Sequence, residues 1–397
     1  MPREPLATGS IRSNWTLILA LVLISINLRP LLTGLGPVVD SIRASLQLSG
    51  TAIGLLITLP VLCFGAFAPF APRLLRFASA ERIILIAMIV LIAGIALRSL
   101  FGVTGLVAGT LLGGASISVI MVLVPAIIKK RFPAQAGNMM GLYSTALCIG
   151  AAVSAGFTVP LENLFGDWRW ALAFWLIPVV VTIPFWLPHI PRNGRSAEEQ
   201  QQKKLPRLFK NKLAWQVTLL MGLQSSIAYC VFGWLPVILI DRGLTALTAG
   251  FVLSLSVVMQ LVTSPTAPWL ATRGKDQRLV LMCMLALTAF GLMALLYAPL
   301  SWVWVATVVL GLGMGGTFSI ALALLVLRAP NAQIAASLSG MVQGVGYTIA
   351  ALAPLLTGLL YELTNNWNAV GVLFALLLLG SAYFGYFAAQ ARLVQAE

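Results

Sequence analysis

The stretch Ser25-Ile26-Asn27-Leu28-Arg29-Pro30-Leu31-Leu32-Thr33-Gly34 places an arginine and a proline inside the first long apolar run of the chain, which starts near Trp15. Arg29 lies fourteen residues into that run. At about 1.5 Å per residue this depth is roughly 20 Å, past the centre of a hydrocarbon core about 30 Å thick. Pro30 removes a backbone donor and clashes with the carbonyl one turn back, so we expect the helix to kink here.

Arg29 has two interpretations, because an arginine at this depth is costly unless it meets water, a partner or an anion. In the first, the side chain extends to the periplasmic face or pairs with a backbone carbonyl. In the second, it contacts an anion in a water-filled cavity. We favour the second, since we find no other lysine, arginine, aspartate or glutamate as deep in an apolar run of this sequence.

The composition indicates a polytopic membrane protein. Of the 397 residues, 59% are hydrophobic and 9% are charged, whereas a soluble protein has about 25% charged residues. The net charge of +14 does not indicate a nucleic-acid partner, because the basic residues occupy short connections between apolar runs. The four cysteines fall inside apolar runs and the single histidine, His189, ends one, so we expect no metal site and no cofactor.

Twelve apolar runs are long enough to cross a bilayer: 15–39, 51–76, 82–101, 103–128, 136–161, 168–188, 213–240, 247–270, 278–298, 301–327, 333–361 and 366–389. We therefore expect an all-α integral membrane protein with twelve transmembrane helices in two pseudo-symmetric six-helix bundles. The predicted parts are a cytoplasmic arm (1–14), a first bundle (15–188), a cytoplasmic linker (189–212), a second bundle (213–389) and a C-terminal tail (390–397).

The two halves of the sequence resemble each other. A Pro-x-x-Pro motif at Pro69 precedes Arg82 as a second one at Pro265 precedes Arg278, and both pairs are 196 residues apart. Gly113-Gly114 and Gly315-Gly316 repeat at a similar offset of 202. A six-span unit duplicated in parallel is the architecture of a transporter whose site lies between the halves.

The distribution of positive charge predicts the topology. Of the 25 basic residues, 20 lie on the side of the N-terminus and four on the other side, with Arg29 within the membrane. This bias places both chain ends in the cytoplasm. We expect a multi-pass protein of the bacterial inner membrane, and a monomer.

Ten polar or aromatic side chains within the spans are candidates to contact a substrate: Arg29, Asn27, Thr33, Tyr143, Gln224, Tyr229, Trp234, Gln260, Gln343 and Tyr347. For each of them, hydrogen bonding between helices is the ordinary alternative. Gln343 and Tyr347 are four residues apart and share one helix face. No nucleophile–base pair or phosphate-binding loop is visible, and the acidic residues near spans fall at their periplasmic ends, so we expect neither an enzyme nor an obvious central proton carrier.

Several motifs resemble the major facilitator superfamily, and within it the cyanate-permease-like branch, the CynX/NimT group. They are Asn27-Leu28-Arg29-Pro30, Thr58-Leu59-Pro60, the run 125–133, the run 214–219, Gly233-Trp234-Leu235-Pro236 and the run 338–347. The resemblance extends from about residue 15 to about residue 389 and implies the major facilitator fold. It implies small substrates: cyanate in one member and 2-nitroimidazole in another.

The loop between the second and third spans departs from that superfamily. Its usual aspartate and glycine are missing from the segment 73–82. The cytoplasmic gate must then be held in another way, and the candidate gating residues are Arg73, Arg76, Glu81 and Arg82.

The hypothesis that follows is a secondary active or facilitative transporter for a small anionic or planar polar solute, working by alternating access with Arg29 as the central contact. Charge-assisted hydrogen bonds from a guanidinium suit such a role. One alternative is an exporter of drugs or neutral nitroaromatic rings that stack on Tyr143, Tyr229, Trp234 and Tyr347. Another is a membrane sensor with a transporter-like fold, although the sequence has no sizeable soluble output domain.

The predicted topology can be tested in intact cells. Because both termini and the 189–212 linker are expected in the cytoplasm, a cysteine introduced at Ser196 should resist a membrane-impermeant thiol reagent and the linker should be cut only by protease on the cytoplasmic side. Labelling of that cysteine from the periplasm would contradict the topology.

Overall fold

The computed structural model describes residues 15–48, 50–191 and 208–395, and its regular elements there are all helices. The first half contains α1 (Trp15–Asn27), α2 (Pro30–Thr33), α3 (Val39–Leu46), α4 (Gly50–Phe67), α5 (Ala71–Leu74), α6 (Ala80–Leu100), α7 (Gly102–Arg131), α8 (Ala136–Phe165), α9 (Trp168–Ala173) and α10 (Leu176–Trp186). The second half contains α12 (Lys212–Asp241), α13 (Ala246–Ala271), α14 (Arg278–Tyr297), α15 (Val303–Leu327), α16 (Ala332–Thr364) and α17 (Trp367–Ala388). The predicted arm (1–14) and residues 192–207 of the predicted linker lie outside the described residues.

Among the described residues, eleven helical segments are long and apolar enough to cross a membrane. The predicted span 51–76 differs, because it is divided into α4, a 3-10 turn (Ala68–Phe70) and α5, with a shorter apolar stretch at Thr58–Leu74. Pro69 is the second residue of the 3-10 turn, and Pro72 is the second residue of α5. A missing backbone N–H costs least at such positions in the first turn of a helix. The predicted all-α membrane fold is confirmed, and its second span is interrupted by these prolines.

The break predicted at Pro30 is present. α1 ends at Asn27, and Arg29 caps the short helix α2 that begins at Pro30. Pro30 has no N–H for the carbonyl of Ile26, and Gly150 of α8 packs directly against that carbonyl. A side chain at position 150 would collide with this backbone, so a glycine is needed where α8 crosses the break.

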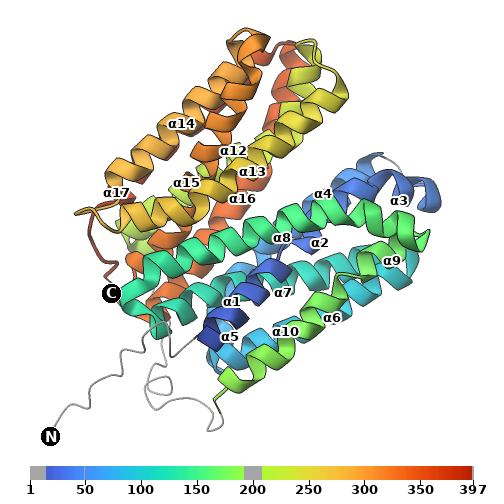
Figure 1. The fold of residues 1–397 in the computed structure, drawn as a ribbon. Coiled ribbons are helices and arrows are strands. Elements are labelled where there is room, and N and C mark those ends of the chain that lie inside the picture. Colours follow the sequence, from blue (N-terminus) through green and yellow to red (C-terminus); the bar gives the residue numbers. More distant parts are fainter. Residues whose placement is uncertain (1–14, 49, 192–207, 396–397) are drawn as a thin grey trace, which may run out of the picture.

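Two bundles of helices meet at one end of the molecule and diverge at the other (Figure 1). The helix pairs repeat between them: α6 packs on α7 as α14 packs on α15, and α1 packs on α8 as α12 packs on α16. The Asn211 side chain, just before α12, donates to the Gln395 carbonyl near the C-terminus at 2.9 Å. The start of α12 and the segment after α17 therefore lie together, at the end of the molecule where the bundles meet (Figure 1). We call that end of the molecule the closed end.

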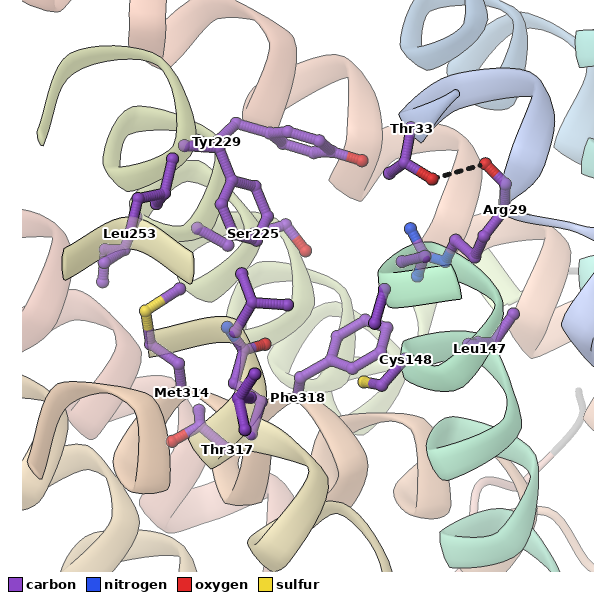
Figure 2. Close-up of a pocket in the computed structure, with 18 of the residues that line it drawn as sticks. Arg29, Thr33, Leu147, Cys148, Ser225, Tyr229, Leu253, Met314, Thr317 and Phe318 are labelled. Carbon is purple, nitrogen blue, oxygen red and sulfur yellow. Dashed lines mark hydrogen bonds between the residues drawn. The ribbon is translucent and has the colours of Figure 1, made fainter. Parts of the chain in front are cut away.

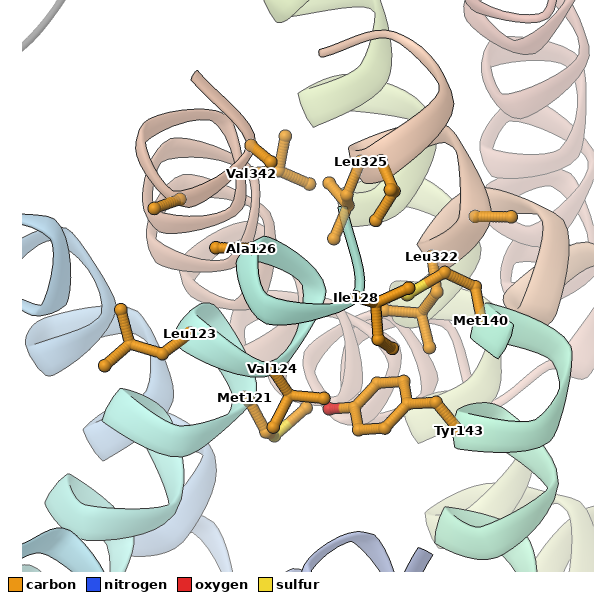
Figure 3. Packing of buried hydrophobic residues seen from close by; sticks show 14 of the residues in the cluster. Met121, Leu123, Val124, Ala126, Ile128, Met140, Tyr143, Leu322, Leu325 and Val342 are labelled. Carbon is orange, nitrogen blue, oxygen red and sulfur yellow. The ribbon is translucent and has the colours of Figure 1, made fainter. Parts of the chain in front are cut away.

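The buried apolar clusters agree with closure at one end only. One cluster is continuous between the halves, with Met121, Val124 and Ile128 of α7 beside Leu322 and Leu325 of α15 (Figure 3). Away from the closed end, the halves have separate cores. One consists of residues such as Leu35, Leu106 and Trp168 in the first half, and the other of residues such as Ile227, Leu310 and Phe374 in the second.

Small residues allow the halves to approach at the closed end. A Cβ atom added to Gly344 of α16 would lie 2.7 Å from the ring of Pro69, closer than real side chains pack. Neutral hydrogen bonds between described residues also cross the interface. Gln343 Nε2 donates to the Met121 carbonyl at 3.0 Å, Ser144 Oγ donates to the Ser264 carbonyl at 3.3 Å, and Cys148 Sγ lies 3.6 Å from Ser264 Oγ. Close packing and a few neutral hydrogen bonds therefore hold this contact.

Candidate functional site

A cavity of about 530 Å³ lies between the halves. It is lined by Arg29, α2 and α8 from the first half and by α12, α13, α14, α15 and α16 from the second. Its volume falls in the range of about 300–1,000 Å³ that is typical of pockets for drug-sized ligands. Most of the lining is aliphatic or aromatic, with polar side chains at a few points. A mostly apolar cavity with a few convergent polar groups is the usual form of a small-molecule site.

Arg29 is the charged residue of the described lining, which contains no aspartate or glutamate. Its guanidinium carbon lies 5.8 Å from the centre of the Phe318 ring, which comes from the other half. Thr33 Oγ1 donates to the Arg29 carbonyl at 3.0 Å and lies 2.5 Å from Ser154 Oγ of α8, so the broken segment is tied to its neighbour (Figure 2). The cavity therefore has a positive charge at the side that belongs to the first half.

Six of the ten predicted contact residues line this cavity: Arg29, Thr33, Gln224, Tyr229, Gln260 and Tyr347. The rings of Tyr229 and Tyr347 are 6.5 Å apart at an edge-on angle, and Phe64 packs 5.6 Å from Tyr347. Gln224 Nε2 donates to Ser225 Oγ at 2.7 Å. Their placement keeps these six residues as candidates for contact with a solute.

Asn27 and Trp234, two of the ten predicted contact residues, do not line the cavity. Asn27 Nδ2 donates to Thr182 Oγ1 at 2.9 Å, and this contact joins α1 to α10. Trp234 Nε1 donates to the Pro354 carbonyl at 3.0 Å, next to the ring of Trp367. Both side chains join helices within one half, as polar residues in membrane helices commonly do.

Tyr143 and Gln343 also lie outside the cavity lining. Tyr143 is buried beside Met121 and Val124 in the apolar cluster that joins the halves (Figure 3). Gln343 shares a helix face with Tyr347 as predicted, but it is one turn nearer the closed end. Its amide binds Ser339 Oγ at 2.7 Å as well as the Met121 carbonyl. These two residues thus belong to the contact between halves.

Arg98, one of the four basic residues counted on the side opposite the termini, is a buried cation. It is 2% exposed on α6, and its Nη1 donates to the Leu31 carbonyl at 2.6 Å. This carbonyl lies in α2, immediately after the break that carries Arg29. The sequence feature that points to this burial is the position of Arg98 three residues before the end of the apolar run 82–101. From that position the side chain can turn into the protein rather than toward water.

The predicted gating residues take separate partners. Glu81 is 1% exposed, and its Oε1 lies 3.7 Å from Nη2 of Arg131 at the end of α7. Neither carboxylate oxygen accepts a hydrogen bond from the described residues. Arg82 donates to the Pro191 carbonyl at 3.1 Å, and Arg73 donates to the Pro69 carbonyl and lies over the Phe70 ring. These contacts, including Glu81–Arg131, lie within the first half. Among the residues that the structure describes, the Arg76 side chain has no hydrogen-bond or ion-pair partner.

The second half repeats this arrangement without a carboxylate. Gln277, which is 196 residues after Glu81, accepts a hydrogen bond from Arg328 at the end of α15. Arg328 also donates to the carbonyls of Ala388 at 2.8 Å and Ala389 at 2.9 Å. Burial lowers the pKa of Arg328 to about 10, which leaves it charged at neutral pH. In each half, an arginine therefore ties the start of the third span to the end of the fourth.

Comparisons with known proteins identify relatives over most of the chain. Residues 16–351 match the family described as Major Facilitator Superfamily. The 2-nitroimidazole transporter of Escherichia coli (strain K12) is 35% identical over 93% of this chain and 94% of its own, and the cyanate transport protein CynX of the same strain is 31% identical over 88% and 91%. The fold is similar to that of the proton:xylose symporter XylE bound to 6-bromo-6-deoxy-D-glucose, with a TM-score of 0.79, 14% identity and coverage of 95% and 96%. This family and these relatives are transporters and not enzymes.

We predict that Arg98 stabilises the break at Pro30. The change Arg98→Met removes a charged donor from the Leu31 carbonyl, so amide hydrogen exchange in residues 28–36 should accelerate by at least about tenfold. The matched control is Arg242→Met, because Arg242 donates to the Leu295 and Ala298 carbonyls in the other half. Unchanged exchange at residues 28–36 in Arg98→Met would show that the break holds without this arginine.

We also predict that Glu81 favours closure. Glu81→Gln weakens the ion pair with Arg131 at the end of α7, and α7 packs against the second half at the closed end. The conformation that is closed there and open at the diverging end should therefore lose population. Cys148 lines the cavity, and its labelling by an impermeant maleimide added outside cells should fall by at least about twofold, in a background with Cys283→Ser. Asp276→Asn, which breaks a solvent-accessible pair with Arg278, is the control. Equal labelling of Cys148 in wild type and Glu81→Gln would exclude a role in closure.

Proposed function

Because this chain belongs to the Major Facilitator Superfamily, we propose that it moves a small anionic or planar polar solute across the bacterial inner membrane by alternating access, with Arg29 as the central contact. The observation that supports this most is the guanidinium of Arg29 in an inter-half cavity whose described lining has no carboxylate. In a low-dielectric site, an anion is the partner that such a cation lacks.

The orientation of the transport cycle follows from the charge bias. With 20 of 25 basic residues on the side of the termini, the closed end faces the cytoplasm and the diverging end faces outward. The structure then corresponds to a form in which the cavity receives solute from outside. Closure of the diverging end and opening of the apolar contact at the closed end complete the exchange of access, carried out by a monomer.

Two relatives support the two kinds of solute in the proposal, a small anion and a planar polar ring. One related protein is a cyanate transport protein, and another is a 2-nitroimidazole transporter. Cyanate is a small anion and 2-nitroimidazole is a planar polar ring, and a planar guanidinium can donate paired hydrogen bonds to either. Arg29 is the group on which both cases depend.

A second candidate is an exporter of neutral ring compounds, and the aromatic lining favours it. Tyr229, Tyr347 and Phe318 line the cavity. Trp234 and Tyr143, which the sequence also indicated as stacking partners for a ring, do not line it. In this case ring stacking would supply the affinity and Arg29 would contribute little. The two candidates therefore differ in how strongly binding depends on Arg29.

The test is the affinity of purified protein for cyanate and for 2-nitroimidazole. Arg29→Gln should weaken binding roughly ten- to a hundredfold, because a charged hydrogen-bond donor is lost. Arg29→Lys should restore only part of the affinity, since lysine lacks the planar fork. Arg273→Gln, which removes an arginine stacked on Trp269 outside the cavity, is the control.

Two outcomes would contradict the proposal. Normal affinity of Arg29→Gln for both probes would show that Arg29 is not a ligand and would favour the neutral-ring exporter. A large fall in melting temperature for both Arg29→Gln and Arg29→Lys, with affinity retained in the folded fraction, would assign Arg29 a structural role.

A further inference from the structure

Two buried polar groups in the cavity lining have no hydrogen-bond partner among the described residues. They are Nε2 of Gln260 on α13 and Oγ1 of Thr317 on α15. Gln260 is 8% exposed and Thr317 is 2% exposed, so both side chains are buried. A buried donor or hydroxyl without a partner is costly, and such a group in a binding cavity points to a ligand that satisfies it.

Both groups belong to the second half, opposite the arginine. Figure 2 shows Arg29 and Thr33 on one side of the cavity, Thr317 and Met314 on the other, and the Phe318 ring between them. The lining from α13 and α15 also includes apolar residues such as Leu253 and Met314. The cavity therefore has a cation at one side, an apolar middle and unpartnered hydrogen-bonding groups at the other side.

A triatomic anion such as cyanate would use only one part of this arrangement. It would fill a small share of about 530 Å³ and leave Gln260 and Thr317 unpartnered if it bound at Arg29. A ligand that pairs at both sides and covers the apolar middle recovers the desolvation cost of all three regions.

We propose that the substrate is an organic monocarboxylate with a flat apolar body and a hydrogen-bonding group at its far tip. This rests on the proposed function, in which Arg29 contacts the solute. The guanidinium binds the carboxylate through paired N–H donors, and the Phe318 ring packs against the body. The amide of Gln260 and the hydroxyl of Thr317 bind the tip; an amide presents a donor or an acceptor, and a hydroxyl serves as either.

Such a solute contacts both halves of the transporter at once. Its carboxylate is held by Arg29 at the break between α1 and α2, and its tip by Gln260 of α13 and Thr317 of α15. A ligand favours a conformation only through interactions that differ between conformations. A solute that bridges the halves provides that difference, because closing the cavity brings its two binding sides together.

The experiment compares 4-hydroxybenzoate with 4-methylbenzoate, which has nearly the same shape but no hydrogen-bonding tip. Wild-type protein should bind 4-hydroxybenzoate roughly three- to tenfold more tightly. Gln260→Leu should reduce this ratio to about one without weakening 4-methylbenzoate. Gln216→Leu, which changes a glutamine of α12 outside the cavity lining, should keep the wild-type ratio. Thr317→Val provides a second variant of the tip site and should reduce the ratio as well.

The outcomes separate this inference from the proposed function. Equal wild-type affinity for the two benzoates, a ratio that persists in both Gln260→Leu and Thr317→Val, or binding of cyanate without binding of either benzoate would overturn the inference. If Arg29→Gln weakens cyanate in that last case, the proposed function stands. If Arg29→Gln changes no anion's affinity, the proposed function fails, and with it the carboxylate contact.

Discussion

The break at Pro30 is the constraint on which the cavity depends, because it exposes backbone polar groups where no bulk water is available to satisfy them. In a membrane each such group needs an internal partner or close shielding. The Ile26 carbonyl is shielded by the backbone of Gly150, and the Leu31 carbonyl accepts from Arg98. With the break secured in this way, Arg29 can leave the helical path and present its guanidinium to the space between the halves. Arg98 is itself a buried arginine, and its hydrogen bond to the Leu31 carbonyl thus helps to hold Arg29 in position.

The contact between the halves is different in character from the contacts within them. The ion pairs Glu81–Arg131, Asp167–Arg169 and Asp276–Arg278 each lie inside one half, as do the Arg328 hydrogen bonds. The closed end instead consists of apolar side chains packed against one another, of glycines against proline rings and of a few neutral hydrogen bonds. Apolar contacts are non-directional, so they can be separated and remade without stranding a buried charge. This division suits two rigid bodies that move relative to each other.

Sequence reasoning recovered the elements that depend on local chemistry. Apolar length predicted the spans, Pro30 predicted the break, and the 196-residue offset predicted the repeated helix pairs. It failed where the outcome depends on which way a helix faces. Asn27 is the last residue of α1 and meets α10, whereas Arg29 lies beyond the end of that helix and faces the cavity. Gln343 and Tyr347 share one face of α16 and are one helical turn apart. Gln343 lies in the contact at the closed end, whereas Tyr347 lines the cavity. Arg98 was counted among the basic residues on the side opposite the termini, whereas the structure buries it against α2.

The duplication also explains why the cavity is polarised. The offset that aligns Pro69 with Pro265 aligns Arg29 with Ser225, and both residues line the cavity. At the position equivalent to Pro30 the second half has Ser226, and α12 continues unbroken from Lys212 to Asp241. The repeat therefore gives each half a residue at the same place, but only the first half has the break and the charge. The proposed solute would have one favoured orientation between two such unequal walls, since its negative group would gain a charged hydrogen bond on one side only. Under the proposed function, loss of symmetry at a single turn would thus let two similar bundles form a site that distinguishes the ends of its solute.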